Sequence, residues 1–390
     1  MENPFSIALP LPEGFEAAPD ILALGGELKS SICRVSRGKA AITEAIGDLE
    51  QESIYRHFSD QVDAVFKKKT PAHLVIDRHP DYLSAQWGQK LAREHGVKIT
   101  AVQHHHAHIA SVMADNGLPI NSKPVLGIAL DGLGFGDDGS IWGGELLLAD
   151  YHGFQRLACF KPAAMLGGAA AIHEPWRNTM AHLLPIREQV FDRFTDIEII
   201  QFLKSKPVQM LQTMIDRGLN APQASSCGRL FDAVAATLGL CREKVGFEAE
   251  AAIALEQLAS TCFEHETKTY AYSIDEGLCL QLNWQPMWLE LLRDLQRGTE
   301  AAIIASRFHH TLIHALSAVT LKLKEAHHFD SIALSGGVFQ NRLLSTGLAA
   351  TLQKKGLPAL QHRQLPTHDG GLSLGQAVIA AAHVSFCHSS

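Results

Sequence analysis

The sequence contains no Cys-x2-Cys pair, which is the spacing that many structural zinc sites use. Its cysteines are odd in number and scattered along the chain, at Cys33, Cys159, Cys227, Cys241, Cys262, Cys279 and Cys387. This usage argues against zinc fingers and is typical of a protein in a reducing cytosol.

Long apolar runs and basic clusters are also missing. No apolar run approaches the ~18 residues that a membrane-spanning helix needs, and Met1–Pro4 supplies no basic segment before the first short apolar piece. The net charge is -7, and the one run of basic residues is Lys67–Lys69. We therefore expect a soluble, cytoplasmic protein with no membrane association, for which a nucleic-acid partner is disfavoured.

The chain is long and apolar enough for two lobes. It has 390 residues, which exceeds an ordinary single domain, and its hydrophobic content is 46%. Residues 1–20 are rich in Pro, Glu and Ala, and we expect an irregular lead-in there. Strand and helix patterns predict a βββαβα unit over residues 21–123. A second unit is predicted over residues 124–390, with a mostly helical insertion at 161–298.

The two predicted units begin alike. Leu22-Ala23-Leu24-Gly25-Gly26 matches Ile128-Ala129-Leu130-Asp131-Gly132 in kind, which we interpret as a degenerate internal duplication. Two α/β halves of this sort, facing each other with glycine loops on both walls of a cleft, form the fold of the actin, sugar-kinase and Hsp70 class (ASKHA). Nucleotide is the expected occupant of such a cleft.

One histidine pair stands out by its context. His104 and His108 are four residues apart in a predicted helix, so both imidazoles lie on one face, close enough to share a metal ion. With 21 histidines, about one His-x3-His pair is expected by chance. A second pair, His310 and His314, lies in an apolar helical pattern without a neighbouring glycine loop, and we interpret it as ordinary helix residues.

Two aspartates complete a candidate ligand set. Asp131 ends a β-like run directly before the glycine-rich segment, and Asp369 precedes the last predicted helix. A hydrogen-bonded core cluster remains the alternative for His104, His108 and Asp131, and a helix N-cap the alternative for Asp369. If all four side chains bind one ion, their mixed nitrogen and oxygen atoms suit Fe(II), Zn(II) or Mn(II).

Two glycine-rich segments predict anion binding. The first contains Gly132, Gly134, Gly136 and Gly139, which would let phosphate oxygens approach the backbone amides closely. A β-hairpin also favours glycines and remains the alternative. Ser335-Gly336-Gly337 stands at a strand-to-helix junction, where free amides face an anion. Lys29 is a candidate anion contact or a solvated residue. Cys227 is interpreted as a small buried cysteine because no base is evidently assigned to it.

Several segments together resemble the C-terminal transferase domain of the HypF carbamoyltransferases: Gln103–His108, Ala129–Glu145, Glu174–Arg177, Arg229–Ala235 and Ser335–Asn341. The resemblance covers nearly the whole chain and extends, more distantly, to the TobZ carbamoyltransferase and to TsaD, a tRNA threonylcarbamoyl transferase. Longer HypF proteins carry acylphosphatase, zinc-finger and YrdC-like modules before this region. This chain has neither the room nor the Cys-x2-Cys pairs for them, so we expect either an excised domain or a naturally short form that lacks them.

The resemblance also implies roles for individual residues. One divalent metal ion, Fe(II) or Zn(II), would be held by His104, His108, Asp131 and Asp369. The residues expected to line the nucleotide phosphates are Gly132, Gly134, Gly143, Gly144, Gly336 and Gly337. Gly228 and Asp232 would meet the ribose, and Asn341 would lie near the adenine.

The implied reaction is carbamoyl transfer. The carbamoyl group of carbamoyl-adenylate, made from carbamoyl phosphate and ATP, would pass to the C-terminal cysteine thiolate of the partner HypE, on the route to the cyanide ligand of [NiFe]-hydrogenase. Because the partner supplies the thiolate, the chain needs no nucleophile of its own. The alternatives are a TsaD-like tRNA transferase, disfavoured by the acidic net charge, and a non-catalytic nucleotide-binding scaffold of the maturation complex.

Overall fold

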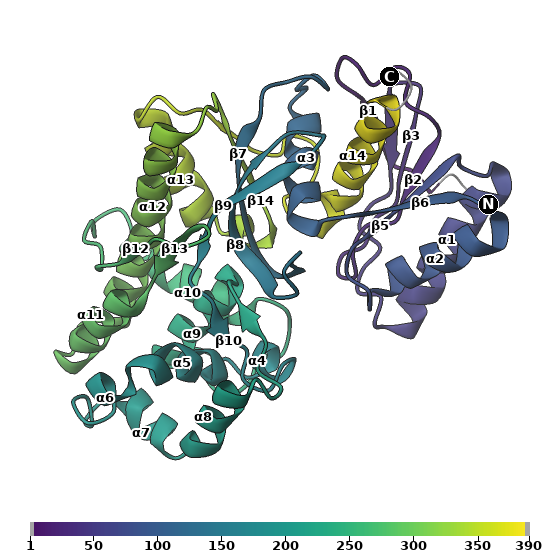
Figure 1. Ribbon diagram of the computed structural model, residues 1–390. Coiled ribbons are helices and arrows are strands. Elements are labelled where there is room, and N and C mark those ends of the chain that lie inside the picture. Colours follow the sequence, from purple (N-terminus) through teal and green to yellow (C-terminus); the bar gives the residue numbers. More distant parts are fainter. Residues whose placement is uncertain (1–3, 387–390) are drawn as a thin grey trace.

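The computed structural model describes residues 4–386; Cys387 and the first three residues of the predicted lead-in lie outside this range. Two mixed sheets stand in two lobes, with helices packed around them (Figure 1). The smaller lobe is built from the beginning of the chain, and the larger lobe contains the second sheet and the helical insertion. Among the described residues, no helix is both long and apolar enough to cross a membrane.

The first sheet has the strand order β1-β4-β3-β2-β5-β6. Its strands are β1 (Ile7–Pro10), β2 (Ile21–Ala23), β3 (Cys33–Ser36), β4 (Lys39–Ile42), β5 (His73–Asp77) and β6 (Lys98–Val102). Helices α1 (Glu52–Lys68) and α2 (Leu83–His95) cover one face. Their apolar stripes bury Phe58 and Val62 against Leu22, Leu74 and neighbouring strand residues, which forms the core of this lobe.

The second sheet has the order β12-β13-β9-β8-β7-β14-β15. Its strands are β7 (Val125–Phe135), β8 (Ile141–Ala149), β9 (Phe154–Phe160), β12 (Ser273–Asp275), β13 (Leu280–Asn283), β14 (Ile332–Ser335) and β15 (Ala359–Leu360). The order β9-β8-β7-β14-β15 repeats the order β4-β3-β2-β5-β6, with the same antiparallel and parallel pairings. This repetition supports the predicted duplication and confirms the ASKHA architecture.

Much of the predicted helical insertion forms the lower part of the larger lobe in Figure 1, and the remainder lies at mid-height beside the second sheet. Its helices are α4 (Ala170–His173), α5 (Trp176–Leu183), α6 (Arg187–Val190), α7 (Glu198–Lys204), α8 (Val208–Arg217), α9 (Cys227–Thr237), α10 (Glu250–Ser260) and α11 (Gln285–Gln296). It also contains the short pair β10 (Ala163–Ala164) and β11 (Gln223–Ala224), and strands β12 and β13, which extend the second sheet. Helices α12 (Ala301–Ala326) and α13 (Arg342–Lys354) follow.

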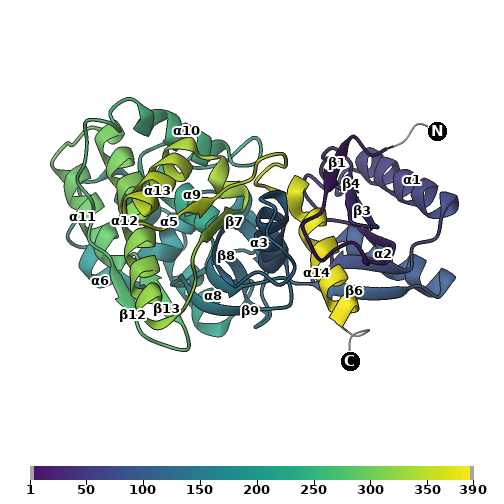
Figure 2. The same cartoon turned by 90° about the horizontal axis from the view of Figure 1, so that it is seen from above.

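Two helices lie side by side between the sheets, as Figures 1 and 2 both show. Helix α3 (His104–Asp115) follows the first sheet but packs on β7, β8 and β14 of the second, and α14 (Leu372–Phe386) ends the second unit but packs on β2 and β3 of the first. Every residue of α3 is buried as a result. Small residues permit the contact, since a Cβ on Gly375 would lie 1.8 Å from the Ala107 carbonyl oxygen.

Two local expectations were wrong. The predicted irregular lead-in contains β1, which pairs antiparallel with β4. The strand was missed because its partner is remote in sequence and because Pro10 argued against a strand, although proline is tolerated on an edge strand such as this one. The predicted glycine loop at 131–139 is largely strand. Strand β7 runs through to Phe135 with a bulge between Leu130 and Gly134, and a short turn leads into β8.

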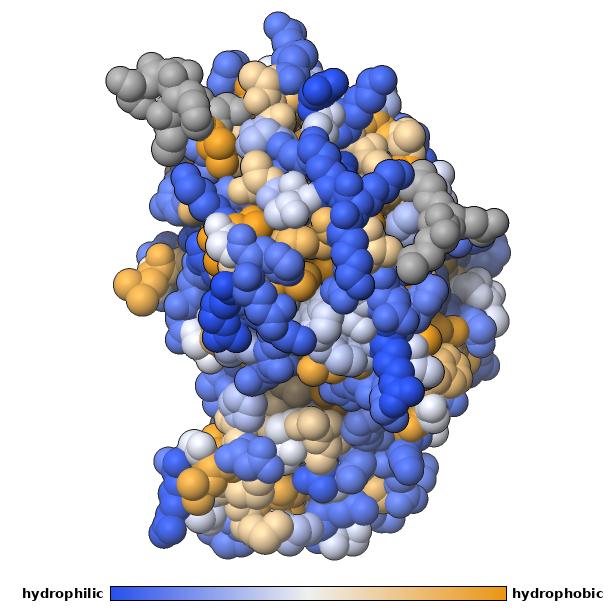
Figure 3. All heavy atoms as spheres, turned by 90° about the vertical axis from the view of Figure 1, so that its right-hand side faces the viewer, coloured by the Kyte–Doolittle hydropathy of each residue, from blue (hydrophilic) through white to orange (hydrophobic). Residues whose placement is uncertain are grey.

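Seen from the smaller lobe, the surface is mostly hydrophilic, and the hydrophobic residues form small separate groups (Figure 3). This pattern is ordinary for a folded domain, in which single apolar side chains on the surface are common. This face therefore points to no docking surface, and the candidate ligands lie in the interior, where the lobes join.

Candidate metal and nucleotide site

Four predicted ligands meet where the lobes join. His104 and His108 lie in the first turns of α3, Asp131 lies at the bulge of β7, and Asp369 opens a 3-10 turn (Asp369–Gly371) before α14. One ligand atom from each of the four lies within 4.8 Å of the others. Among residues 4–386, this is the one group of His, Cys, Asp or Glu side chains with that geometry.

The imidazole Nε2 atoms point toward the two carboxylates. Asp131 Oδ2 lies 3.4 Å from His104 Nε2 and 3.2 Å from His108 Nε2, and Asp369 Oδ1 lies 3.7 Å and 3.4 Å from the same nitrogens. Asp369 does not cap the following turn, since the side chain that accepts the capping hydrogen bond is that of His368. The structure thus favours the ligand interpretation of Asp369 over the N-cap interpretation.

The other imidazole nitrogens are held by a second layer of polar groups. His104 Nδ1 lies 2.8 Å from Asp77 Oδ2, and His108 Nδ1 lies 3.2 Å from Ser335 Oγ. With Nδ1 as a donor in both rings, each Nε2 points at the carboxylates; it carries a proton in the metal-free site and would present a lone pair to a bound ion. Metal-binding histidines are oriented in this way in proteins. Sequence reasoning missed Asp77; its signal was a carboxylate at the tip of a predicted buried strand.

The charges of the group suit a cation. Although burial opposes ionisation, the imidazoles of His104 and His108 hold the pKa of Asp131 well below its usual range. Burial opposes protonation of His104, but the carboxylates of Asp369 and Asp77 raise its pKa well above the ordinary value. Three carboxylates surround two imidazoles, so a metal-free site attracts protons, and a divalent ion could replace them.

The other histidines near this group have different partners. His105 is buried against Trp142, and its Nδ1 lies 3.2 Å from the Gln103 amide. His106 Nε2 lies 2.6 Å from the Asp150 carbonyl oxygen. His310 and His314 lie far along the chain in α12, where they bond to a backbone carbonyl and to a tyrosine hydroxyl. These contacts agree with their interpretation as ordinary helix residues.

Both glycine segments meet at Asp131. The amides of Gly132 and Gly337 donate to Asp131 Oδ1 at 2.8 Å and 3.3 Å. Gly336 adopts a φ of 104°, and a Cβ there would approach the Leu130 carbonyl. The two walls of the predicted nucleotide site therefore touch the predicted metal site.

Close packing explains most of the remaining predicted glycines. A Cβ would collide with His105 at Gly134, with Asp131 at Gly143, with Ser225 at Gly144 and with the Gly132 backbone at Gly228. At Gly132, by contrast, a Cβ would meet nothing within 4 Å. Of the glycines expected to line phosphates, Gly132 is the one that borders open space.

Three other residues that were predicted to contact the nucleotide or an anion contact other residues of the protein. Asp232 is buried and forms a 2.8 Å ion pair with Arg229. Asn341 caps α13 with its side-chain oxygen, and its amide lies 3.0 Å from His309 Nε2. Lys29 lies in a turn between β2 and β3 at a φ of 46° and forms a 2.5 Å ion pair with Glu248 of the other lobe. Their predicted nucleotide or anion contacts remain predictions.

Sequence reasoning also missed a buried polar cluster beside the antiparallel pair of β7 and β8. Glu145 is fully buried, accepts a hydrogen bond from Ser225 and lies 2.7 Å from Arg156 Nε. The Arg156 guanidinium stacks on the Trp142 ring at 4.1 Å. This cluster fixes the β8 strand beside Asp131. The Trp-Gly-Gly-Glu motif was the signal, although it gave no hint of Arg156.

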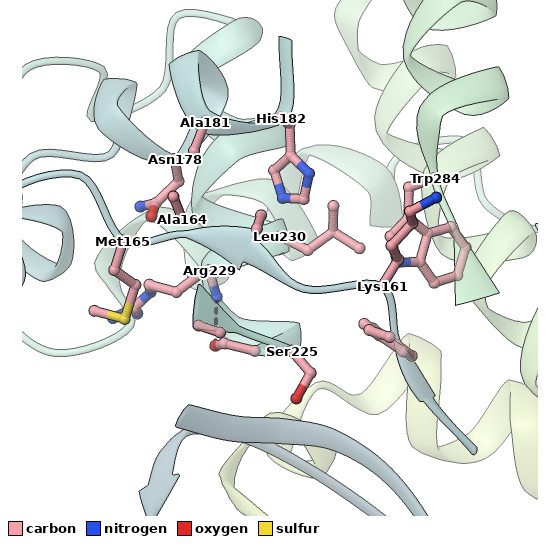
Figure 4. A pocket seen from close by; sticks show the side chains of 14 residues that line it. Lys161, Ala164, Met165, Asn178, Ala181, His182, Ser225, Arg229, Leu230 and Trp284 are labelled. Atoms are coloured by element: carbon pink, nitrogen blue, oxygen red, sulfur yellow. Dashed lines mark hydrogen bonds between the residues drawn. The ribbon is translucent and has the colours of Figure 1, made fainter. Parts of the chain in front are cut away.

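A pocket opens on the far side of this cluster, between α5, α9, β10 and Trp284, with the ring of His182 pointing into it (Figure 4). Two of its lining residues, Ser225 and Ser226, also bond to residues of β7 and β8. None of the four clustered ligands lines the pocket. Cys227 begins α9 nearby; it is buried, and burial raises the pKa of its thiol. That environment agrees with an inert structural cysteine.

Comparisons with known proteins match this geometry to one family. The family model described as "Carbamoyltransferase, Kae1-like Domain, second subdomain" matches residues 127–376, and the "HypF Kae1-like domain" matches residues 16–115. Carbamoyltransferase HypF of Rhodobacter capsulatus is 38% identical over 96% of this chain and 48% of its own length. A carbamoyltransferase HypF homolog of Cupriavidus necator is 35% identical over 95% of this chain and 93% of its own.

Solved structures agree. A full-length HypF, crystallised in a phosphate- and nucleotide-bound form, has a TM-score of 0.85 and 32% identity, covering 95% of this chain and 56% of that one. The crystal structure of T. kodakarensis HypF has a TM-score of 0.82 and 28% identity, covering 98% of this chain and 49% of that one. The chain thus spans about half the length of several relatives. It belongs to the HypF carbamoyltransferase family.

Proposed function

We propose that this chain is a metal-dependent carbamoyltransferase of [NiFe]-hydrogenase maturation. The observation that carries the proposal is the convergence of His104, His108, Asp131 and Asp369 beside two glycine segments. Family membership supports the transferase class, and the nucleotide and phosphate bound by the full-length HypF structure support a nucleotide substrate. The donor would be carbamoyl-adenylate, formed from carbamoyl phosphate and ATP, and the acceptor the C-terminal cysteine of HypE.

The residues present fit one divalent ion. The two Nε2 atoms and one oxygen from each aspartate would hold it, and Fe(II) and Zn(II) both accept such a mixed set. When bound, the ion would act as a Lewis acid that polarises the carbamoyl carbonyl and offsets charge on the departing phosphate. Asp77 and Ser335 would keep the two imidazoles oriented toward it.

The protein's own contribution to the reaction is positioning. The adenylate phosphate would approach at Gly132, where the backbone borders open space. The acceptor sulfur forms a bond to the carbamoyl carbon while the bond from that carbon to the phosphate oxygen breaks, and AMP leaves. The acceptor would attack as a thiolate, because the thiolate is the nucleophilic form of cysteine; Cys227 of this chain is buried and takes no part in the step.

Intact-mass spectrometry of HypE tests the proposal. HypE is incubated with this chain and carbamoyl-adenylate, and in a second mixture with ATP and carbamoyl phosphate. We expect one carbamoyl group on the terminal cysteine when adenylate is supplied. His104→Ala should abolish transfer while HypE binding persists, and His310→Ala, which alters the other His-x3-His pair, should leave transfer intact. Transfer by His104→Ala at the wild-type rate would refute the proposed site, and binding without transfer by the wild type would indicate a scaffold.

A further inference from the structure

A chain of hydrogen bonds leads from the ligand group to a third histidine. Ser335 Oγ, which contacts His108 Nδ1, also lies 3.2 Å from His362 Nε2. His362 Nδ1 lies 3.3 Å from Asp115 Oδ2 at the end of α3. His108 and Asp115 thus belong to one helix, and Ser335 and His362 connect them from outside it.

The acceptor at the far end sets the direction of every hydrogen. Asp115 accepts backbone amides from Arg363, Gln364 and Leu365 at 2.7 to 3.3 Å. Burial opposes its ionisation, but the hydrogen bonds from His362 and these amides outweigh burial and lower its pKa. An ionised carboxylate only accepts, so His362 Nδ1 must donate to it.

The remaining assignments follow in sequence. Burial lowers the pKa of His362, so its ring is neutral and carries one N–H, which Asp115 has taken. His362 Nε2 is therefore an acceptor for the Ser335 hydroxyl hydrogen, which the Thr367 carbonyl shares at 3.3 Å. The lone pair of Ser335 Oγ then accepts the N–H of His108 Nδ1. In the metal-free site His108 Nε2 carries a proton toward Asp131 Oδ2 at 3.2 Å; when an ion takes the place of that proton, the lone pair of His108 is on Nε2, facing Asp131 and Asp369.

We propose that His362 is a positioning residue for the metal site, which acts through Ser335 to fix His108 in the tautomer that presents Nε2 to the ion. The inference rests on the metal site of the proposed function. It assigns His108 a support built from three side chains, whereas His104 is supported directly by Asp77. Substituting such an outer partner weakens metal binding by roughly 10- to 100-fold in known sites.

Two substitutions of the same residue separate this role from packing. In His362→Asn, the amide nitrogen reproduces the Nδ1 donor to Asp115 but nothing reaches Ser335. In His362→Gln, the longer side chain places an oxygen near the Nε2 position, where it accepts the Ser335 hydroxyl. Both remove the imidazole ring. We expect His362→Asn to lose about tenfold in affinity for Zn(II) and His362→Gln to lose much less.

Serine variants test the route. Ser335→Ala should weaken Zn(II) binding by about tenfold, and adding His362→Asn should weaken it no further, because His362 acts only through the hydroxyl. Ser306→Ala is the matched control; its buried hydroxyl likewise donates to a backbone carbonyl, that of Ala259 at 2.8 Å, but it lies in α12 and touches none of the four ligands. It should retain wild-type affinity.

Affinity is measured by competition with a chromophoric chelator, and Co(II) absorption spectra report the ligand geometry independently of any catalytic assay. Equal affinities for the wild type, His362→Asn and Ser335→Ala would overturn the inference, as would losses that simply add in the double variant. Failure of the wild type to bind Zn(II) or Co(II) would overturn both this inference and the proposed metal site. Metal binding with the expected pattern but no carbamoyl transfer would refute the proposed reaction alone.

Discussion

Gly375→Ala should damage the metal site without touching a ligand. Gly375 of α14 faces the backbone of Ala107 in α3, and the new Cβ would lie 1.8 Å from the Ala107 carbonyl oxygen, whereas ordinary contacts begin near 3.4 Å. The obstacle is backbone in the middle of a helix, so it cannot rotate away. The two helices must therefore separate by up to the missing distance of 1.6 Å.

That separation acts on the ligands directly. His104 and His108 are carried by α3, and Asp369 by the turn that opens α14, with only 3.4 to 3.7 Å between their ligand atoms. Overpacking of this kind costs about 1–3 kcal/mol of unfolding free energy. We expect Zn(II) affinity to fall by at least tenfold in addition, because one carboxylate is drawn away from the two nitrogens.

Gly117→Ala provides a control of similar stability. Gly117 follows α3 at a φ of 76°, and a Cβ there would meet nothing within 4 Å. Left-handed strain costs about 1–2 kcal/mol, but it moves neither helix. Denaturant unfolding of the metal-free variants gives the stabilities, and chelator competition gives the affinities. If Gly375→Ala bound Zn(II) as tightly as Gly117→Ala, the helix contact would have no part in positioning the ligands.

Further predictions concern the carboxylate that bonds to His104, the glycine that borders open space and a pair of thiols. Asp77→Asn should weaken Zn(II) binding by roughly 10- to 100-fold in the same competition assay, because an amide can donate to His104 Nδ1 and favour the wrong tautomer. Gly132→Ala should unfold at the wild-type denaturant concentration but bind a fluorescent ATP analogue more weakly, since its methyl group enters open space; unchanged nucleotide binding would place the phosphates elsewhere. The Sγ atoms of Cys159, in β9, and Cys279, directly before the neighbouring strand β13, lie 3.6 Å apart, so diamide should remove both thiols together in a thiol count. Hydrogen bonding from Cys159 lowers the pKa of Cys279 while burial raises that of Cys241, so iodoacetamide should alkylate Cys279 at lower pH; the reverse order would contradict this assignment.

The sequence predicted the four clustered side chains better than their surroundings. His104 and His108 were recognisable because helical spacing places residues four apart on one face, and Asp131 because it follows an apolar β-like run and precedes the glycines. Asp77 and Ser335 could not be placed in the same way. Their contacts with the two imidazoles depend on how two sheets, far apart in sequence, meet around α3.

Glycine patterns were ambiguous for a physical reason. A glycine serves equally where backbone approaches a ligand and where it approaches another backbone. The segment after Asp131 was predicted as a loop, but Gly134 lies in a bulged strand, and its missing side chain makes room for His105. Similarly, the sequence identified α14 as the last helix, but its packing on the first sheet depends on tertiary contacts that leave no periodic signal.

The central claim is that carbamoyl transfer occurs at a metal ion held by these four side chains. The most direct test is a metal titration of the metal-free chain, with HypE and carbamoyl-adenylate present and transfer followed by intact mass. We expect transfer to rise in step with metal occupancy and to saturate at about one ion per chain, as a single four-ligand site requires. Full transfer by the metal-free chain would contradict it.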